Sequence, residues 1–154
     1  MEVRSKRFAC LFFLVASISC ALPAQTNSTM SNTVNNDGHR LTLTAKDRVA
    51  EQTLPGSLAS PEKYKFVEVS VVSVVNPGQH SVSFDVQHVS SNGETTFLGT
   101  FSLFPADNPG TFIVPTKRKL AAGGRLVLSL KLPPEVSDDD SLVIIAKEMR
   151  LRED

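Results

Sequence analysis

Tryptophan is absent from the 154-residue sequence, tyrosine occurs once, and there are only two cysteines, Cys10 and Cys20. The chain after Cys20 therefore cannot form a disulfide, so a domain built from it must be stabilised by its apolar core alone. With Tyr64 as the single tyrosine, the sequence also has little of the aromatic surface on which sugar rings stack. Its nine phenylalanines suit a packed interior better.

The amino-terminal segment has the residue order of a secretory signal peptide. The first seven residues carry three bases and one acid, and Phe8–Ile18 is a mostly apolar run followed by small residues. Such a run is too short to span a bilayer, so we predict a signal peptide over residues 1–24 and a secreted or periplasmic product. Cleavage would follow Ala21 or Ala24, and lipid attachment at Cys20 is the alternative.

The remaining chain is close to neutral. Removal of the first 24 residues takes three of the 16 bases and one of the 16 acids, which leaves a net charge of −2. This balance indicates neither a nucleic-acid partner nor an anionic membrane. Residues 25–40 are polar and have little to bury, so we predict a disordered tether there and one domain over residues 41–154.

The run Tyr64–Val75 predicts the central strand of that domain, because β-branched and aromatic residues dominate it and a turn signal, Asn76-Pro77-Gly78, ends it. The valines occupy odd positions in its first half and even positions later: Val67, Val69, Val71, then Val72 and Val74. A regular strand cannot change parity and keep one buried face. We therefore predict a β-bulge near Val71 and Val72, or burial of both faces.

Six further segments show strand patterns bounded by Gly, Pro, Asn or Asp, namely 41–44, 80–89, 95–104, 111–114, 125–132 and 142–151. Between the first two, Val49 and Leu54 could belong to another short strand, but Pro55-Gly56 and Ser60-Pro61 break that stretch into loop. We expect 80–89 to form a hairpin with the central strand, and its inward face to hold Val82, Phe84 and Val86. The next strand places four residues on one parity, Phe97, Gly99, Phe101 and Leu103. The strand 125–132 places four leucines on one face, Leu126, Leu128, Leu130 and Leu132.

No stretch has a helical period of apolar residues, and the strand patterns recur about every ten residues. This pattern predicts an all-β fold, an antiparallel β-sandwich of about seven to eight strands that is immunoglobulin-like or jelly-roll-like.

The polar residues show no arrangement typical of catalysis. The three histidines, His39, His80 and His88, lack the close spacing of metal ligands, and no serine lies in a Gly-x-Ser-x-Gly turn. The acidic run 138–140 is typical of a solvated turn between strands. We therefore predict no enzyme activity, no catalytic residue, no metal site and no cofactor.

Two groups of residues are candidates for contact with a partner. Phe104 has the opposite parity to Phe101 and Leu103, so it is either an exposed apolar contact or a core residue on a second face. A short basic cluster near it in sequence is either ordinary surface or a contact for an acidic partner. The full candidate set is Phe104, Pro105, Phe112, Lys117, Arg118 and Lys119.

Several segments also occur in an order that resembles a known accessory domain: Leu41–Leu43, Lys65–Val69, Phe84–Val86, Phe97–Phe104, Leu126–Leu130 and Asp138–Ile145. They are similar to the C-terminal β-sandwich domain of tyrosinases and polyphenol oxidases of the type-3 copper class, over roughly residues 39–151. The resemblance implies a non-enzymatic sandwich that packs over a catalytic domain and shields its site. That catalytic domain binds two copper ions through six histidines and has no counterpart here, so no catalytic residue carries over.

We therefore expect a secreted, non-catalytic accessory or interaction module whose partner is a secreted copper oxidase or another extracellular protein. The alternative is an extracellular module that binds a ligand or a polysaccharide. The absence of tryptophan disfavours a surface that stacks sugar rings. A small exported enzyme would instead require a cleft with converging polar groups.

Overall fold

The computed structural model describes residues 40–56, 58 and 60–154. These residues form nine strands and a short 3₁₀ helix, η1: β1 (Arg40–Thr44), β2 (Val49–Thr53), η1 (Pro61–Lys63), β3 (Phe66–Val75), β4 (Ser83–Val89), β5 (Thr95–Ser102), β6 (Gly110–Pro115), β7 (Arg125–Lys131), β8 (Val143–Lys147) and β9 (Arg150–Arg152). The predicted signal peptide and all of the predicted tether except Arg40, the first residue of β1, lie outside the described residues.

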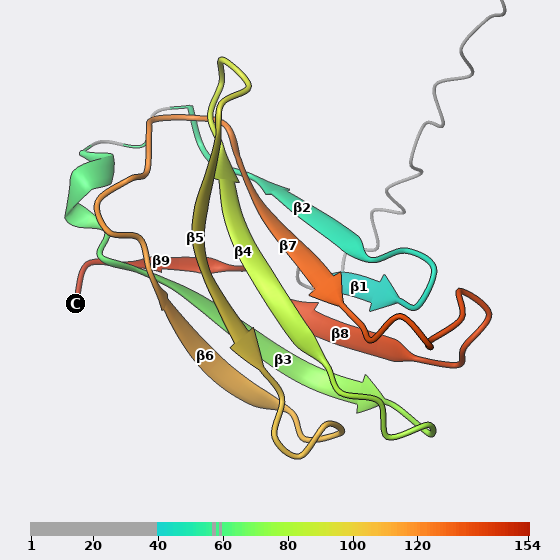
Figure 1. The fold of residues 1–154 in the computed structure, drawn as a ribbon. Helices are drawn as coiled ribbons and strands as arrows, with labels where there is room; N and C mark the ends of the chain where they lie inside the picture. The colour runs from blue at the N-terminus through green and yellow to red at the C-terminus, as the bar shows by residue number, and fades with distance from the viewer. Residues whose placement is uncertain (1–39, 57, 59) are drawn as a thin grey trace, which may run out of the picture. The chain divides into compact units, whose positions relative to one another are not determined.

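The strands form two antiparallel sheets that face one another, which confirms the predicted β-sandwich (Figure 1). One sheet has the order β1-β8-β3-β6, with β9 also paired to β3, and the other has the order β2-β7-β4-β5. Strand β1 pairs with β8, β2 with β7, β3 with β6 and β4 with β5. This nested pairing is the connectivity of a jelly roll, one of the two predicted forms of the sandwich.

The core lies between the sheets and follows the predicted alternation in β4 and β7. Val82, Phe84 and Val86 are fully buried, as are Leu126 and Leu128 of the neighbouring strand β7. Because successive side chains of a strand point to opposite faces, a period of two places these residues in one layer.

A column of aromatic rings closes the sandwich where the edge strands β5 and β6 meet. The Phe101 ring stacks on Phe84 at 4.8 Å between centroids and on Phe112 at 4.3 Å. The column therefore joins β4 and β5 of one sheet to β6 of the other. Phe112 is a partly buried part of this packing rather than an open contact surface.

The bulge predicted in β3 is confirmed. Val71 pairs with Ala146 but Ser73 pairs with Ile145, so Val72 is an extra residue in the ladder between β3 and β8. Val71 is buried before the bulge and Val74 packs on the core after it. The bulge thus changes the parity of the buried face and keeps one strand in the sandwich along its whole length.

The predicted hairpin between the central strand and 80–89 is wrong. Strand β4 pairs with β5 and β7, and it belongs to the other sheet. Both sides of β3 are already occupied, by β6 on one and by β8 and β9 on the other. The turn that starts at Asn76 therefore carries the chain across from one sheet to the other.

The predicted parity of 95–104 is wrong in its first half. Val86 pairs with Gly99 and Gln87 with Phe97, so Leu98 is an extra, bulged residue. Leu98 is fully buried, whereas the Phe97 side chain is 50% exposed. The adjacent apolar pair allowed either residue to face inward, and the pairing with β4 selects Leu98.

The predicted last strand, 142–151, is divided into β8 and β9. The Gln52 side chain lies at the break: its amide nitrogen donates to the Met149 carbonyl at 2.9 Å, and its oxygen accepts the Met149 N–H at 2.6 Å. These bonds satisfy the backbone between the two strands. Strand β8 then pairs with the end of β3 and β9 with its beginning.

Candidate functional site

Four connections meet at one end of the sandwich, which we call the acidic end: residues 45–48, 76–82, 103–109 and 132–142. Their charged side chains are six carboxylates and two bases: Asp47, Asp107, Glu135, Asp138, Asp139, Asp140, Lys46 and Arg48. Side-chain bonds join the connections to one another, so this end is a built surface rather than a set of separate loops.

Asn76 is the centre of these bonds. Its side-chain amide is only 4% exposed, and the nitrogen donates to the carbonyls of His80 at 2.9 Å and Ala106 at 3.2 Å. The amide oxygen accepts the His80 N–H at 3.1 Å. A short side chain with both a donor and an acceptor can thus close its own turn and hold the neighbouring connection 103–109.

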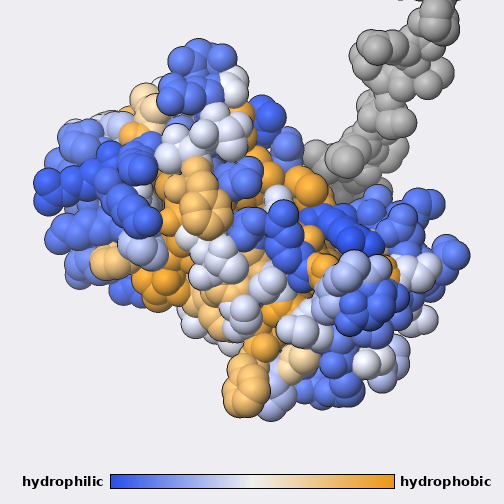
Figure 2. Space-filling model, viewed as in Figure 1, coloured by the Kyte–Doolittle hydropathy of each residue, from blue (hydrophilic) through white to orange (hydrophobic). Residues whose placement is uncertain are grey.

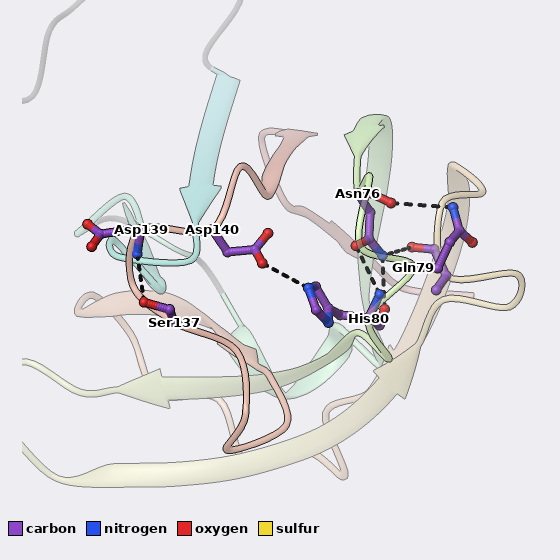
Figure 3. Close-up of polar contacts among 7 residues, drawn as sticks. Asn76, Gln79, His80, Ser137, Asp139 and Asp140 are labelled. Carbon is purple, nitrogen blue, oxygen red and sulfur yellow. Dashed lines mark hydrogen bonds and ion pairs between the residues drawn. The ribbon is translucent and has the colours of Figure 1, made fainter.

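His80 and Asp140 form a hydrogen-bonded pair across two connections. The His80 Nε2 lies 2.9 Å from the Asp140 Oδ2, and both side chains are 23% exposed. Figure 3 shows the ring and the carboxylate pointing toward one another, while the Asp139 carboxylate points away. A Cβ on Gly78 would lie 2.2 Å from the His80 Nε2, so glycine at position 78 leaves the space in which the ring lies.

The acidic turn is solvated at two of its three carboxylates, as the sequence predicted. Asp138 is bound by the Arg48 guanidinium at 2.8 Å but stays 70% exposed, whereas Asp140 is held by His80 and is 23% exposed. Asp139 is exposed, and its N–H donates to the Ser137 hydroxyl at 3.3 Å. Two of the three carboxylates also bind a side chain of another connection, and Asp140 alone is half-buried.

The side-chain bonds of this arrangement position the loops of the acidic end. Every buried side-chain nitrogen or oxygen in the described part of the chain has a hydrogen-bond partner. Within residues 40–56, 58 and 60–154, no three His, Cys, Asp or Glu side chains gather as ligands of one ion. The remaining histidine there, His88, is 1% exposed, and its Nε2 lies 3.3 Å from the Gly123 carbonyl oxygen.

The structure does not bring the six candidate contact residues together. Phe104 is 95% exposed beside the exposed Pro105, on the connection 103–109 of the acidic end. The basic cluster of Lys117, Arg118 and Lys119 follows β6, at the opposite end of that strand. The candidates therefore belong to two surfaces at the two ends of the sandwich, and Phe112 lies in the packing between them.

Sequence reasoning missed part of the exposed apolar surface. Phe97 on β5 and Ile113 on β6 are each about half exposed, on the strands that precede and follow the connection 103–109. Figure 2 shows apolar side chains in a band across the middle of the face that carries β5 and β6, between polar ends. The sequence feature that could have identified the exposed Phe97 was the adjacent apolar pair Phe97-Leu98, because a strand with a bulge at this point can bury only one of the two side chains.

No family model matches the chain, and no curated protein matches its sequence. Among the described residues, helical structure is limited to the three-residue 3₁₀ helix η1, and none of these residues forms a helix long and apolar enough to cross a membrane.

Proposed function

We propose that this protein is a secreted, non-catalytic interaction module that docks on a partner protein through the connection 103–109, with Phe104 as the anchor. The observation that carries the proposal is the 95% exposure of the Phe104 side chain. Buried aromatic anchors contribute a large share of binding energy at protein interfaces, and an aromatic ring kept in water on one partner is a ready source of it.

The loop that presents Phe104 is held in place before any partner arrives. The Asn108 N–H donates to the Pro105 carbonyl at 3.0 Å, and the Asn76 side chain binds the Ala106 carbonyl. The Gln79 amide nitrogen lies 3.3 Å from an Asp107 carboxylate oxygen. A loop ordered in advance loses less conformational entropy on binding, which favours its use as a docking element.

The charges around Phe104 indicate the chemistry of the partner surface. The acidic end carries six carboxylates against two bases, and Asp107 lies three residues from Phe104 on the same loop. A partner surface that is electrostatically complementary to the acidic end would have an apolar pocket for Phe104 with basic residues around it. A secreted copper oxidase is the partner class that the resemblance to the C-terminal domain of type-3 copper oxidases supports, and this assignment is an analogy of fold and sequence order.

The test places a photo-reactive phenylalanine analogue at position 104 of the exported protein and, as a matched control, at position 97. Cross-linking in the native secretion fluid should capture one protein through position 104, and that protein is then purified. Phe104→Ala should raise the dissociation constant for it at least about 30-fold, the effect of a strong hot spot, and Phe97→Ala should change it less than about threefold.

Equal losses for the two alanine variants would disprove docking through Phe104. A purified partner that binds the Phe104→Ala variant as tightly as the original protein would do the same. Phe104 contributes almost nothing to the core, so the variant should unfold at the same urea concentration as the original protein, which separates lost binding from lost folding.

A further inference from the structure

The surface farthest from the acidic end is formed by three segments, which we call the basic end: residues 60–65, the connection 116–124 and β9. Figure 1 shows η1, the connection after β6 and β9 gathered on one side of the molecule, near the carboxyl terminus. The backbone joins them: the Thr116 N–H donates to the Lys65 carbonyl at 2.8 Å, and the Lys65 N–H donates to the Arg152 carbonyl at 2.8 Å. These three segments therefore form one continuous surface.

Bases outnumber acids on this surface. It carries seven bases, Lys63, Lys65, Lys117, Arg118, Lys119, Arg150 and Arg152. Four carboxylates lie on it or beside it, Glu62, Glu68, Glu153 and Asp154. In Figure 2 strongly hydrophilic side chains cover this side of the molecule. The excess is densest at positions 117–119, where three exposed bases follow one another with no acid.

Most of these bases have no ionic partner within the part of the chain that the structure describes. The ion pair of Arg152 with Glu68, 3.0 Å between Nη1 and Oε2, is the one found at this end. Elsewhere among the described residues, three of the six bases are matched by nearby carboxylates: Arg48 by Asp138, Arg125 by Glu51 and Lys131 by Asp85. Most of the bases without an ionic partner among the described residues therefore lie at the basic end, although the full sequence has a formal net charge of zero.

The backbone that presents the central bases is fixed in an unusual conformation. Lys117 and Arg118 have φ values of 54° and 57°, in the left-handed region that favours glycine. The fully buried Thr116 hydroxyl donates to the Tyr64 carbonyl at 2.6 Å and accepts the Arg118 N–H at 3.2 Å. Two successive bases thus occupy positions where glycine would relieve strain, and strained backbone of this kind is concentrated at functional positions.

We infer that the basic end binds a linear polysaccharide that carries carboxylate or sulfate groups. Several exposed bases on one surface suit a chain with repeated negative charges, because each contact releases a counterion from the polymer. Recognition by charge requires no aromatic platform, so the lack of tryptophan does not count against it. This surface is separate from the Phe104 loop, and the inference does not depend on the proposed docking function.

Two other anionic surfaces fit the basic end less well. A membrane surface favours apolar side chains beside the bases, and the exposed large apolar residues of the described chain lie outside these three segments: Val49, Val72, Val75, Phe97, Phe104 and Ile113. The acidic end of a second copy has the right sign, but two of its six carboxylates, Asp138 and Asp140, are already engaged by Arg48 and His80. A soluble polyanion is the occupant with the best match.

The test measures binding of the exported protein to polygalacturonate, dextran sulfate and neutral dextran of equal length by titration calorimetry, between about 50 and 200 mM salt. We expect binding to a charged polymer and none to neutral dextran. Comparison of polygalacturonate with dextran sulfate shows whether the protein prefers carboxylate or sulfate groups. A triple variant, Lys117→Gln with Arg118→Gln and Lys119→Gln, should weaken binding at least about tenfold at low salt. The slope of the logarithm of its binding constant against the logarithm of the salt concentration should be smaller in magnitude by about two to three.

The matched control removes three bases elsewhere, as Arg40→Gln with Lys46→Gln and Lys131→Gln, and so gives the same net charge. It should change the affinity less than about twofold. Equal losses in both triple variants would overturn the inference, because they would show a response to net charge alone. Tighter binding to phosphatidylglycerol vesicles or duplex DNA than to either charged polysaccharide would also overturn it, as would no binding to any of them.

The second-copy alternative predicts a dimer in sedimentation experiments that the Lys117–Lys119 variant abolishes, and that result would likewise overturn the inference. Phe104→Ala should leave polysaccharide binding unchanged. Loss of polymer binding and loss of partner docking are therefore separate outcomes.

Discussion

The two ends of the sandwich use their polar residues in opposite ways. At the acidic end, side chains hold the connections together: Asn76 bonds to two neighbouring backbone segments, and His80 binds Asp140. At the basic end, backbone bonds and the buried Thr116 hydroxyl hold the segments together. The charged side chains of the basic end are consequently available to bind a ligand.

The difference shows that a cluster of charges is not in itself evidence of a binding surface. The acidic residues are dense in the sequence, yet two of the three at positions 138–140 have an internal partner. The basic residues are fewer per segment but come together from three parts of the chain, and most of them stay unmatched. Substitution of the side chains that bond the connections of the acidic end should therefore change stability, and substitution of the exposed bases should change binding.

Asn76→Ala should give the largest loss of stability, a decrease of about 3 kcal/mol in the free energy of unfolding, because the His80 N–H and two carbonyls lose a buried partner. Urea denaturation monitored by circular dichroism measures it. The exposed Asn108 serves as control, and Asn108→Ala should change the value by less than about 0.5 kcal/mol. Equal effects at the two positions would show that the Asn76 amide does not organise the acidic end.

Thr116→Val should lower the free energy of unfolding by about 2 kcal/mol, since this isosteric change removes a fully buried hydroxyl that serves both Tyr64 and Arg118. The same urea experiment applies. Thr111→Val is the matched control, because its hydroxyl contacts Ser70 at the surface, and its effect should be about 0.5 kcal/mol or less. If Thr116→Val proved neutral, the basic end would have to be held by its backbone alone.

The His80–Asp140 pair should contribute a coupling energy of about 0.5 to 1 kcal/mol, because both side chains keep about a quarter of their surface in water. A double-mutant cycle with His80→Ala and Asp140→Ala isolates this energy. Replacing the more exposed Asp139 by alanine in the same cycle should give a coupling near zero. A coupling to Asp139 as large as that to Asp140 would contradict the geometry in Figure 3.

The smallest effect is expected for the triple change of Lys117, Arg118 and Lys119 to glutamine, less than about 0.5 kcal/mol in the free energy of unfolding. These side chains are exposed and have no ionic partner among the described residues. Thermal and urea unfolding should therefore match those of the original protein. A loss near that of Asn76→Ala would mean that the bases stabilise the fold and are not free for a ligand.

Local patterns predicted the sandwich and much of its core. The alternation around Phe84 and Leu128 identified buried faces, because a strand with one face in water must alternate. The change of parity in the central run located the bulge at Val72 for the same reason. In both cases the information lies within a few residues of sequence.

The errors concern information that a local pattern does not contain. The turn after Val75 looks like a hairpin turn, but β3 is already paired on both sides by strands distant in sequence. Phe97 and Leu98 are both apolar, and only the pairing with β4 decides between them. Which strands become neighbours depends on the whole set of pairings rather than on any one turn.

The candidate surfaces show the same limit. Phe104 and the basic cluster lie within 15 positions in sequence, but β6 separates them, so the structure places them at opposite ends. The formal net charge of zero likewise conceals a separation of charge along the strands. Total charge is a sum over the sequence, whereas a partner meets only the charges that the fold gathers on one surface.

The nested pairing of the jelly roll also decides when the fold can be completed. Only β4 and β5 are neighbours both in sequence and in a sheet, while β1 must wait for β8, near the far end of the chain. Assembly by local steps would then proceed outward from the middle, and the high contact order predicts slow folding. A chain still emerging from the ribosome cannot pair β1 until β8 has been made, so the sandwich closes only after Lys147 has left the ribosome.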